Sequence, residues 1–288
     1  MILGIDIGNY ATKTSNGINF QSKVSKVGNI LGGDTELIID GEKFFIGTGE
    51  FETEFNKSKK TNFLQLMYAA IALSTDDEEN QVVTGLPIGQ YKEYKDKLKC
   101  RIQENWYKEL KVNGDKKTIY ITDIEIMPES AIVADDDFEG IVLDPGGRST
   151  DICLIRNING KRKIINPVSI PQGTINLFSE VSKQINSKFG IDTKLEDSER
   201  IIKNGLKING ITKNMDFIID IFKSYVDSIV NKLKIEYSLA TEEVLVVGGG
   251  GELLFNAIKN RIPQSILKEN PIFANAEAYG KVGVELWQ

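Results

Sequence analysis

A short acidic loop containing glycine ends an apolar run at two places in this chain. The first is Asp6-Ile7-Gly8-Asn9 and the second is Asp144-Pro145-Gly146-Gly147. Glycine lets the backbone turn tightly and present N–H groups to anionic oxygens. One such loop alone is as readily an ordinary β-hairpin turn. Two of them facing each other would clamp phosphates, so the repetition predicts two related lobes around a nucleotide.

A third glycine cluster strengthens this interpretation. Val246-Val247-Gly248-Gly249-Gly250-Gly251 follows another apolar run and precedes an amphipathic segment. A backbone that carries no side chains can pass close to a ribose or a purine. We therefore expect this cluster on the nucleoside side of the site.

Length and composition limit the class of protein. A chain of 288 residues exceeds the size at which one core usually stops growing, which favours two domains. Its hydrophobic content of 41% and charged content of 26% are typical of a globular protein. No run approaches the ~20 apolar residues of a membrane span, so we expect a cytoplasmic protein without membrane contact. Cys100 and Cys153 are far apart in sequence and are expected to be buried thiols.

The chain contains no histidine. This excludes Ser-His and Cys-His nucleophiles and every histidine-ligated metal site, so carboxylates must carry any acid–base role. The net charge of −6 argues against a broad nucleic-acid-binding surface, because duplex binding depends on Lys and Arg neutralising phosphates. The basic stretch Lys57-Ser58-Lys59-Lys60 is expected to be a solvated loop.

The order of the expected elements repeats, strands first and helices after. Turn signals at Asn16-Gly17 and Asp40-Gly41 predict hairpins. Apolar residues from Phe63 to Ile71 recur at helical spacing behind Thr61-Asn62, which can cap a helix. In the first half we expect strands over 1–5, 11–15, 18–24, 37–39, 43–46 and 81–84, a helix over 90–108 and a strand pair within 118–127. In the second half we expect strands over 141–144, 149–156, 162–170 and 243–247, and helices over 174–188, 195–203, 215–237, 252–259 and 279–288.

The residues around the two acidic loops suit phosphate chemistry. Lys13 could reach a phosphate as a point charge, and Thr12 and Ser149 could donate from their hydroxyls. Phosphate would repel Asp6 and Asp144 unless a hard cation, Mg²⁺ with its waters, lay between them. The sequence therefore predicts Asp6 and Asp144 as metal-site residues.

Met127-Pro128-Glu129-Ser130-Ala131 is a further candidate segment. Proline followed by small residues is typical of a helix N-terminus. A carboxylate in the first turn is also what the helix dipole favours, so Glu129 could be only a structural first-turn residue.

Together these residues resemble the superfamily of actin, sugar kinases and heat-shock chaperone ATPases. The first phosphate motif matches Asp6 to Lys13, the connecting helix Pro128 to Asp135, the second phosphate motif Leu143 to Asp151, and the adenosine motif Val246 to Leu254. Within the superfamily the chain is most similar to the ParM or StbA group of plasmid actin-like proteins. That narrower likeness rests on Val83-Thr84-Gly85-Leu86-Pro87, on Pro128-Glu129-Ser130, on the loop after Asp144, and on Gly248-Gly249-Gly250 with Glu252-Leu253.

The resemblance implies an α/β actin-like fold of two lobes, each a mixed sheet flanked by helices, with the nucleotide between them. Residues 1–136 and 272–288 would form the first lobe and residues 137–271 the second. Glu129 and Asp144 would orient or activate the attacking water, and Asp6 and Asp144 would hold Mg²⁺. The phosphates would be bound by Gly8, Asn9, Thr12, Lys13, Gly146, Gly147 and Arg148. The nucleoside would be flanked by Gly248, Gly249, Gly250, Glu252 and Leu253, with Glu196 and Arg200 nearby.

The resemblance also implies an ATPase or GTPase that polymerises into filaments and segregates plasmid DNA. A small DNA-binding adaptor on a centromere-like site would link the filament to its cargo. Two alternatives share the fold: a sugar-type small-molecule kinase, and a cell-shape or cell-division actin homologue. A scaffold that does not hydrolyse nucleotide is a third. Pro145 departs from the usual pattern because it removes one backbone N–H from the second loop.

Overall fold

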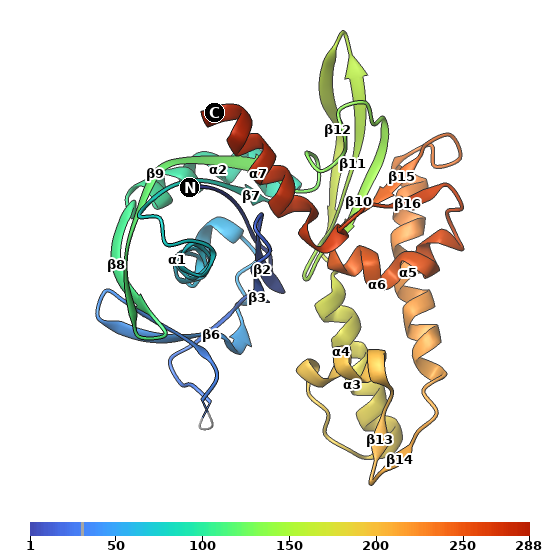
Figure 1. The fold of residues 1–288 in the computed structure, drawn as a ribbon. Coiled ribbons are helices and arrows are strands. Elements are labelled where there is room, and N and C mark those ends of the chain that lie inside the picture. The colour runs from blue at the N-terminus through green and yellow to red at the C-terminus, as the bar shows by residue number, and fades with distance from the viewer. Residues whose placement is uncertain (30–31) are drawn as a thin grey trace.

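The computed structural model describes residues 1–29 and 32–288 and has two lobes side by side (Figure 1). The sheet of the first lobe takes its strands from residues 2–128, and that of the second from residues 140–267. The expected α/β architecture of two lobes is therefore confirmed. The limits given above for the two domains stay a prediction.

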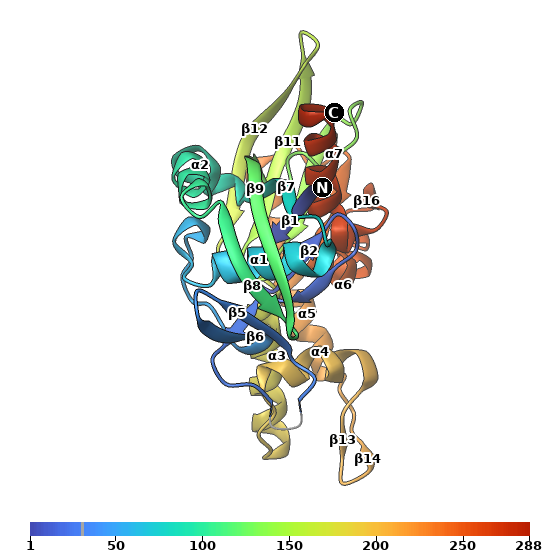
Figure 2. The same cartoon turned by 60° about the vertical axis from the view of Figure 1, so that its left-hand side comes forward.

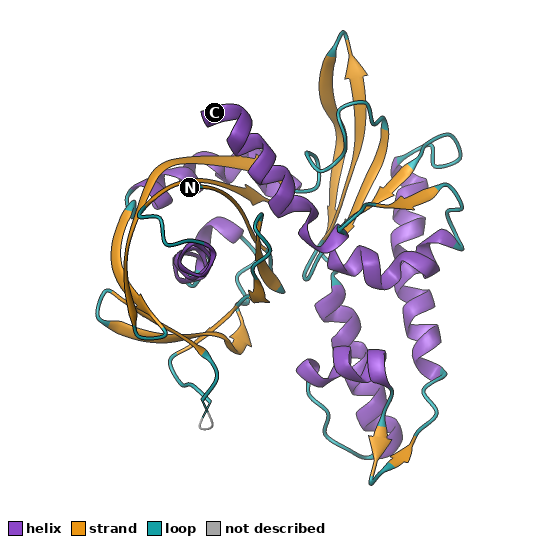
Figure 3. Cartoon of the chain, in the orientation of Figure 1, coloured by secondary structure: helices purple, strands orange, loops and turns teal. Residues whose placement is uncertain are grey.

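The first lobe is a strongly curved sheet wrapped around one helix, α1 (Phe63–Ser74) (Figures 1 and 3). The strand order is β3-β2-β1-β7-β9-β8-β5-β6-β4 among the described residues. Residues 66–71 of α1 are all buried, and a helix that is apolar on every side belongs inside a core. The strands are β1 (Ile2–Ile7), β2 (Ala11–Thr14), β3 (Asn19–Gln21), β4 (Lys23–Ser25), β5 (Thr35–Ile39), β6 (Glu42–Phe51), β7 (Glu79–Leu86), β8 (Tyr107–Val112) and β9 (Asp115–Pro128).

The second lobe is a smaller sheet covered by helices. Its strand order is β12-β11-β10-β15-β16, in which β10 pairs antiparallel with β11 and parallel with β15. A two-stranded hairpin, β13 with β14, projects from the end that carries α3 and α4 (Figure 1). The strands are β10 (Gly140–Pro145), β11 (Thr150–Ile158), β12 (Lys161–Ile170), β13 (Lys207–Ile208), β14 (Ile211–Thr212), β15 (Val244–Val246) and β16 (Ser265–Leu267). The helices are α3 (Thr174–Phe189), α4 (Leu195–Asn204), α5 (Phe217–Glu236) and α6 (Gly248–Lys259).

The last helix, α7 (Ala274–Trp287), returns to the first lobe and packs on β1, as expected (Figure 2). The approach is close because glycines line it. A Cβ on Gly4 would overlap the carbonyl oxygen of Ala276 and the amide of Gly280, and one on Gly85 would overlap the Tyr279 hydroxyl. These glycines let the backbone of α7 lie directly against the sheet.

Several expected elements differ from the structure. The expected helix over 90–108 is shorter, α2 (Ile88–Gln103), because its end supplies β8. Residues 118–127 belong to one strand, β9, which pairs with β8 rather than with itself. The expected strand over 18–24 breaks at Ser22 into β3 and β4, and α6 begins at Gly248 rather than at residue 252. Asn62 stands at the N-cap of α1, but its side chain makes no capping hydrogen bond.

Two further expectations were wrong. No helix forms over residues 128–135: Pro128 ends β9, and the chain turns from Glu129 onward, because Ser130 adopts a left-handed conformation with φ 65° that a helix cannot contain. Cys100 is exposed, whereas Cys153 is buried as expected. No helix among the described residues is long and apolar enough to cross a membrane.

The contact between β1 and α7 gives a test of the fold. Replacing Gly4 with Ala should lower the free energy of unfolding by about 1–3 kcal/mol, because the new methyl group overlaps α7 backbone. The measurement is urea denaturation without nucleotide. As a control, Gly249→Ala places a methyl group in α6 whose nearest neighbour outside the helix backbone, Ile272 Cγ1, is 4.0 Å away, and should be neutral or slightly stabilising. Equal stability of the two variants would contradict the packing described.

Candidate functional site

The two acidic loops and the glycine cluster meet at a cavity of about 550 Å³ between the lobes. Most of the predicted site residues line it. They are Asp6, Gly8, Asn9, Lys13, Glu129, Asp144, Gly146, Gly147, Gly248, Gly249, Gly250, Glu252 and Leu253. The cavity is therefore formed by segments that are far apart in the sequence, as the repeated pattern predicted.

The two loops are hairpin turns of the same construction. Gly8 N–H donates to Ala11 O at 3.1 Å, and Gly146 N–H donates to Ser149 O at 2.8 Å. These two amides close their turns, so any phosphate contacts from the loops would fall to the residues that follow. The turns touch each other, since a Cβ on Gly147 would lie 2.8 Å from the Tyr10 Cβ.

The glycine cluster forms the first turn of α6 and lies against the second loop. Gly248 has φ 78°, and a Cβ there would overlap the Asp144 carboxylate; a Cβ on Gly250 would overlap Pro145 O. Only glycine fits this close approach. The N-terminus of a helix carries partial positive charge and favours anions, and here it lines the cavity.

Six acidic residues line the cavity, and four of them, Asp6, Glu129, Asp144 and Asp151, form one cluster of interacting charges. Strand register pairs Asp144 with Asp151 across β10 and β11, whereas Asp6 pairs with Lys13 across β1 and β2. Asp151 had no predicted role, although its pairing with Asp144 follows from the tight turn between the two aspartates. Ser149 Oγ donates to Asp151 at 3.1 Å and Ser169 Oγ donates to it at 2.5 Å.

Burial raises the pKa of three of these acids, Glu129, Asp144 and Asp151. Burial raises the pKa of Glu129, with Lys57 opposing the rise, and raises the pKa of Asp144, with the hydrogen bond from Ser130 opposing it. Burial together with the charge of Glu129 raises the pKa of Asp151 to about 7. A cation at the cavity would favour the ionised form of all these groups.

Two lysines from the segment before α1 reach the site, one at the carboxylates and one at Asn9. Lys57 pairs with Glu129 and lies 3.9 Å from Asp6, and Lys60 donates to Asn9. Both lysine side chains are 2% exposed, so the expected solvated loop was wrong for them; Lys59 alone is exposed. Burial and the charge of Lys57 lower the pKa of Lys60 to about 8. Nothing local in the sequence separates these lysines from surface lysines.

Helix α4 faces the cavity with different residues from those predicted. Glu199 and Lys203 line it, and Tyr10 donates from its hydroxyl to Glu199 at 2.5 Å. The predicted candidates lie elsewhere: Glu196 pairs with Lys23 at 3.0 Å, and Arg200 pairs with Asp197 of its own helix. The predicted helix is correct, but the residues that face the cavity, Glu199 and Lys203, each lie three positions after the predicted Glu196 and Arg200.

Thr12 and Arg148 do not line the cavity either. Thr12 is fully buried, and its hydroxyl bonds to Ser22 Oγ at 2.9 Å. Arg148 donates across the lobes to the carbonyl oxygens of Glu52 and Thr53. Both residues therefore lie outside the lining of the cavity and bond to neighbouring protein groups instead.

The donor set suits a hydrated divalent cation. Among residues 1–29 and 32–288, no three His, Cys, Asp or Glu side chains are placed so that together they could hold a metal ion, so these side chains alone form no complete cage. Mg²⁺ does not need one, because it is usually held through one or two carboxylates, water and substrate phosphates. Asp6 and Asp144, buried on opposite walls of one cavity, fit that mode.

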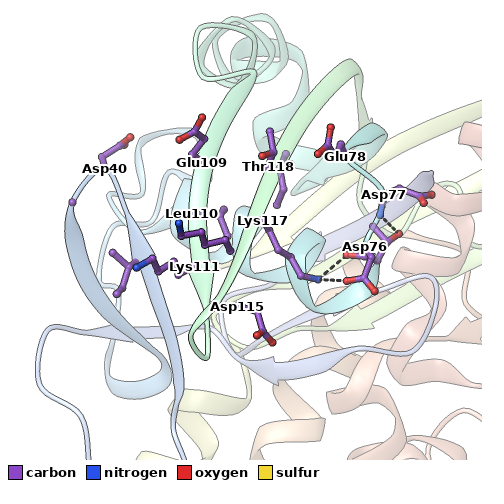
Figure 4. A pocket seen from close by; sticks show the side chains of 15 residues that line it. Asp40, Asp76, Asp77, Glu78, Glu109, Leu110, Lys111, Asp115, Lys117 and Thr118 are labelled. Carbon is purple, nitrogen blue, oxygen red and sulfur yellow. Dashed lines mark hydrogen bonds and ion pairs between the residues drawn. The ribbon is translucent and has the colours of Figure 1, made fainter.

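A second cavity of about 630 Å³ lies on the outside of the first lobe (Figure 4). It is lined from residues 38–119 only, and thus by one lobe. Its Lys117 donates to Thr75 O at 2.9 Å and pairs with Asp76 at 2.8 Å, which fixes the end of α1. None of the three glycine-containing segments reaches this cavity, so it is not the candidate site.

Comparison with known proteins agrees with the two-lobed fold. Residues 4–131 match the family described as "Actin like proteins N terminal domain". No curated protein has a significantly similar sequence. Three solved structures are similar over 99% of each chain: a pCBH ParM non-polymerisable quadruple mutant (19% identity, TM-score 0.82), the archaeal actin homologue Ta0583 in complex with ADP (18%, 0.83) and Bacillus thuringiensis ParM with AMPPNP (16%, 0.70). At these identities the likeness shows the fold, which confirms the expected actin-like architecture.

The buried ion pair between Lys57 and Glu129 makes a stability prediction. Lys57→Met should lower the free energy of unfolding by about 3 kcal/mol, because it leaves the Glu129 carboxylate without its buried partner. Urea denaturation measures the loss. Lys26→Met is the control: it breaks an ion pair with Glu42 in which both side chains are more than half exposed, and should cost less than about 1 kcal/mol. A similar loss in both variants would argue against the buried pair.

Proposed function

We propose that this chain, an actin-like protein by its fold and by the family that its residues 4–131 match, binds and hydrolyses ATP or GTP with Mg²⁺ and assembles into filaments. The observation that carries the proposal is the cavity itself. Two matching hairpin turns, the N-terminus of a glycine-rich helix and four carboxylates converge there from both lobes. Such a site suits phosphoryl transfer to water, which needs positioning and charge neutralisation more than covalent help.

Each residue then has a proposed role. Glu129 orients and activates the attacking water, and Asp144 shares that task. Asp6 and Asp144 hold the waters of Mg²⁺, which supplies neutralising charge for the phosphates when bound. Lys13 and Asn9 contact the phosphates, as do the exposed backbone groups of the two turns and of α6. Gly249, Glu252 and Leu253 flank the nucleoside.

Contacts between the lobes support nucleotide-dependent closure. On the side of the cavity near α4, Tyr10 bonds to Glu199, Lys23 pairs with Glu196, and Arg148 donates to the carbonyls of residues 52 and 53. A nucleotide that touches both turns adds to these contacts only when the lobes are close. Triphosphate binding would therefore favour the closed form and assembly, and hydrolysis would weaken the filament.

The cellular role that we propose is segregation of plasmid DNA in the cytoplasm. The ParM structures among the relatives support it at the level of the fold. A net charge of −6 suits a filament that contacts DNA through a small DNA-binding adaptor rather than directly.

Light scattering with parallel phosphate release tests assembly and hydrolysis together. Mg-ATP or Mg-GTP is added to purified protein at micromolar concentration. We expect a nucleotide-dependent rise that decays as phosphate appears. No rise at any concentration, with turnover only after sugars are added, would instead indicate a small-molecule kinase of the same fold.

Glu129→Ala should slow phosphate release by roughly 100-fold or more and prolong the life of filaments, because the water loses its base. The same two measurements follow both effects. Glu285→Ala, at an exposed position of α7, is the control and should hydrolyse like the wild type. Filaments of Glu129→Ala that disappear faster than those of the wild type would refute the role.

Asp144→Ala should weaken both nucleotide binding and turnover, because one of the two proposed Mg²⁺-holding carboxylates is lost. The test compares nucleotide affinity with and without Mg²⁺ for the wild type, for this variant and for Asp77→Ala, whose side chain is 63% exposed. We expect Mg²⁺ to strengthen binding in the wild type and in Asp77→Ala but much less in Asp144→Ala. An undiminished Mg²⁺ effect in Asp144→Ala would contradict the assignment.

A further inference from the structure

One amide side chain joins the two segments that carry the proposed catalytic residues. Asn275, the second residue of α7, is buried and lines the cavity. Its Oδ1 accepts the Ser130 N–H at 2.9 Å, and its Nδ2 donates to Asp144 Oδ2 at 3.1 Å. The acceptor faces an N–H and the donor faces a carboxylate, so the two partners fix the orientation of the amide.

Ser130 closes the network. Its Oγ donates to the same oxygen, Asp144 Oδ2, at 2.8 Å, and the residue is 1% exposed. Ser130 directly follows Glu129 and has φ 65°, an unfavourable conformation for serine that needs support from its surroundings. The Asn275 amide supplies part of that support by holding the Ser130 N–H.

We propose that Asn275 is a positioning residue that sets the placement of Glu129 relative to Asp144. It holds the turn after Glu129 through one end of its amide and holds the Asp144 carboxylate through the other. The inference rests on the proposed hydrolysis, and it adds a contribution from α7, a helix that otherwise packs on β1. A shift of α7 would thereby change the geometry of the catalytic carboxylates.

The strongest test is Asn275→Asp, which keeps the shape and the acceptor for Ser130 N–H but replaces the donor with a carboxylate facing Asp144. We expect kcat to fall 10–100-fold, the usual effect of losing a group that orients a site residue, with KM changed less than about threefold. Turnover is measured with whichever of Mg-ATP and Mg-GTP the wild type hydrolyses faster. The control is Asn231→Asp, the same chemical change at an exposed position of α5, which should leave both constants unchanged.

A double-mutant cycle separates positioning from general damage to the fold. Asn275 and Ser130 act through one oxygen of Asp144, so Ser130→Ala combined with Asn275→Asp should reduce kcat by clearly less than the product of the single losses. Independent losses that multiply would overturn the proposal, as would an unchanged kcat in Asn275→Asp. Thermal unfolding confirms that each variant is folded. If Asn275→Asp does not fold, Ser130→Ala decides: a lower kcat at unchanged KM supports the network, and a wild-type kcat overturns it.

The outcome for the wild type distinguishes this inference from the proposed function. If the wild type hydrolyses neither nucleotide, the proposed function fails and this inference fails with it. If the wild type hydrolyses nucleotide and Asn275→Asp does so equally well, only the inference about Asn275 fails.

Discussion

The gathering of four carboxylates where the lobes meet is the constraint on which the rest of the site depends. Buried like charges repel one another and lose their hydration, which favours protonation. The chain offsets this with Lys13, Lys57 and hydrogen bonds from serine and asparagine side chains. These partners, Lys13, Lys57, Ser130 and Asn275, come from four separate parts of the sequence. The acidic cluster therefore exists only when both lobes and α7 are in place, which ties the chemistry to the assembled fold.

Glycine makes this assembly sterically possible. The second turn lies between the first turn, α3 and the start of α6, and a Cβ at Gly147, Gly173 or Gly250 would strike backbone of a neighbouring segment. Backbone packed this closely leaves room for the cavity on the remaining side. Gly4 permits the same kind of close backbone contact, here between β1 and α7. Both contacts bring polar backbone and side chains into fixed positions around Asp6 and Asp144.

Sequence reasoning could predict the parts of the site that are encoded locally. The two turns, the glycine cluster, Asp6, Asp144 and Glu129 all stand where short motifs put them, and all of them line one cavity. Lys57, Lys60 and Asn275 could not be predicted, because tertiary contacts alone bring Lys57 and Asn275 to the carboxylates and Lys60 to Asn9. The helix expected after Pro128 failed for a related reason: Asn275, which is distant in sequence, and Asp144 of the next strand hold Ser130 in a left-handed conformation that no local propensity favours. On α4 the helical pattern was correct, but the pattern alone did not fix which turn faces the cavity.

The contacts at the cavity fall into two groups with different consequences. Near α4 the lobes are joined by Tyr10 with Glu199 and by Lys23 with Glu196, pairs whose partners lie on different lobes. Near α7 the Asn275 amide joins Asp144 to the turn after Glu129. Both groups cross between the lobes, but they join different elements: the first joins α4 to the first lobe, and the second joins the start of α7 and the turn after Glu129 to Asp144 of β10. Asp144 is therefore held directly from α7, whereas the contacts at α4 act on the side of the cavity that Glu199 lines.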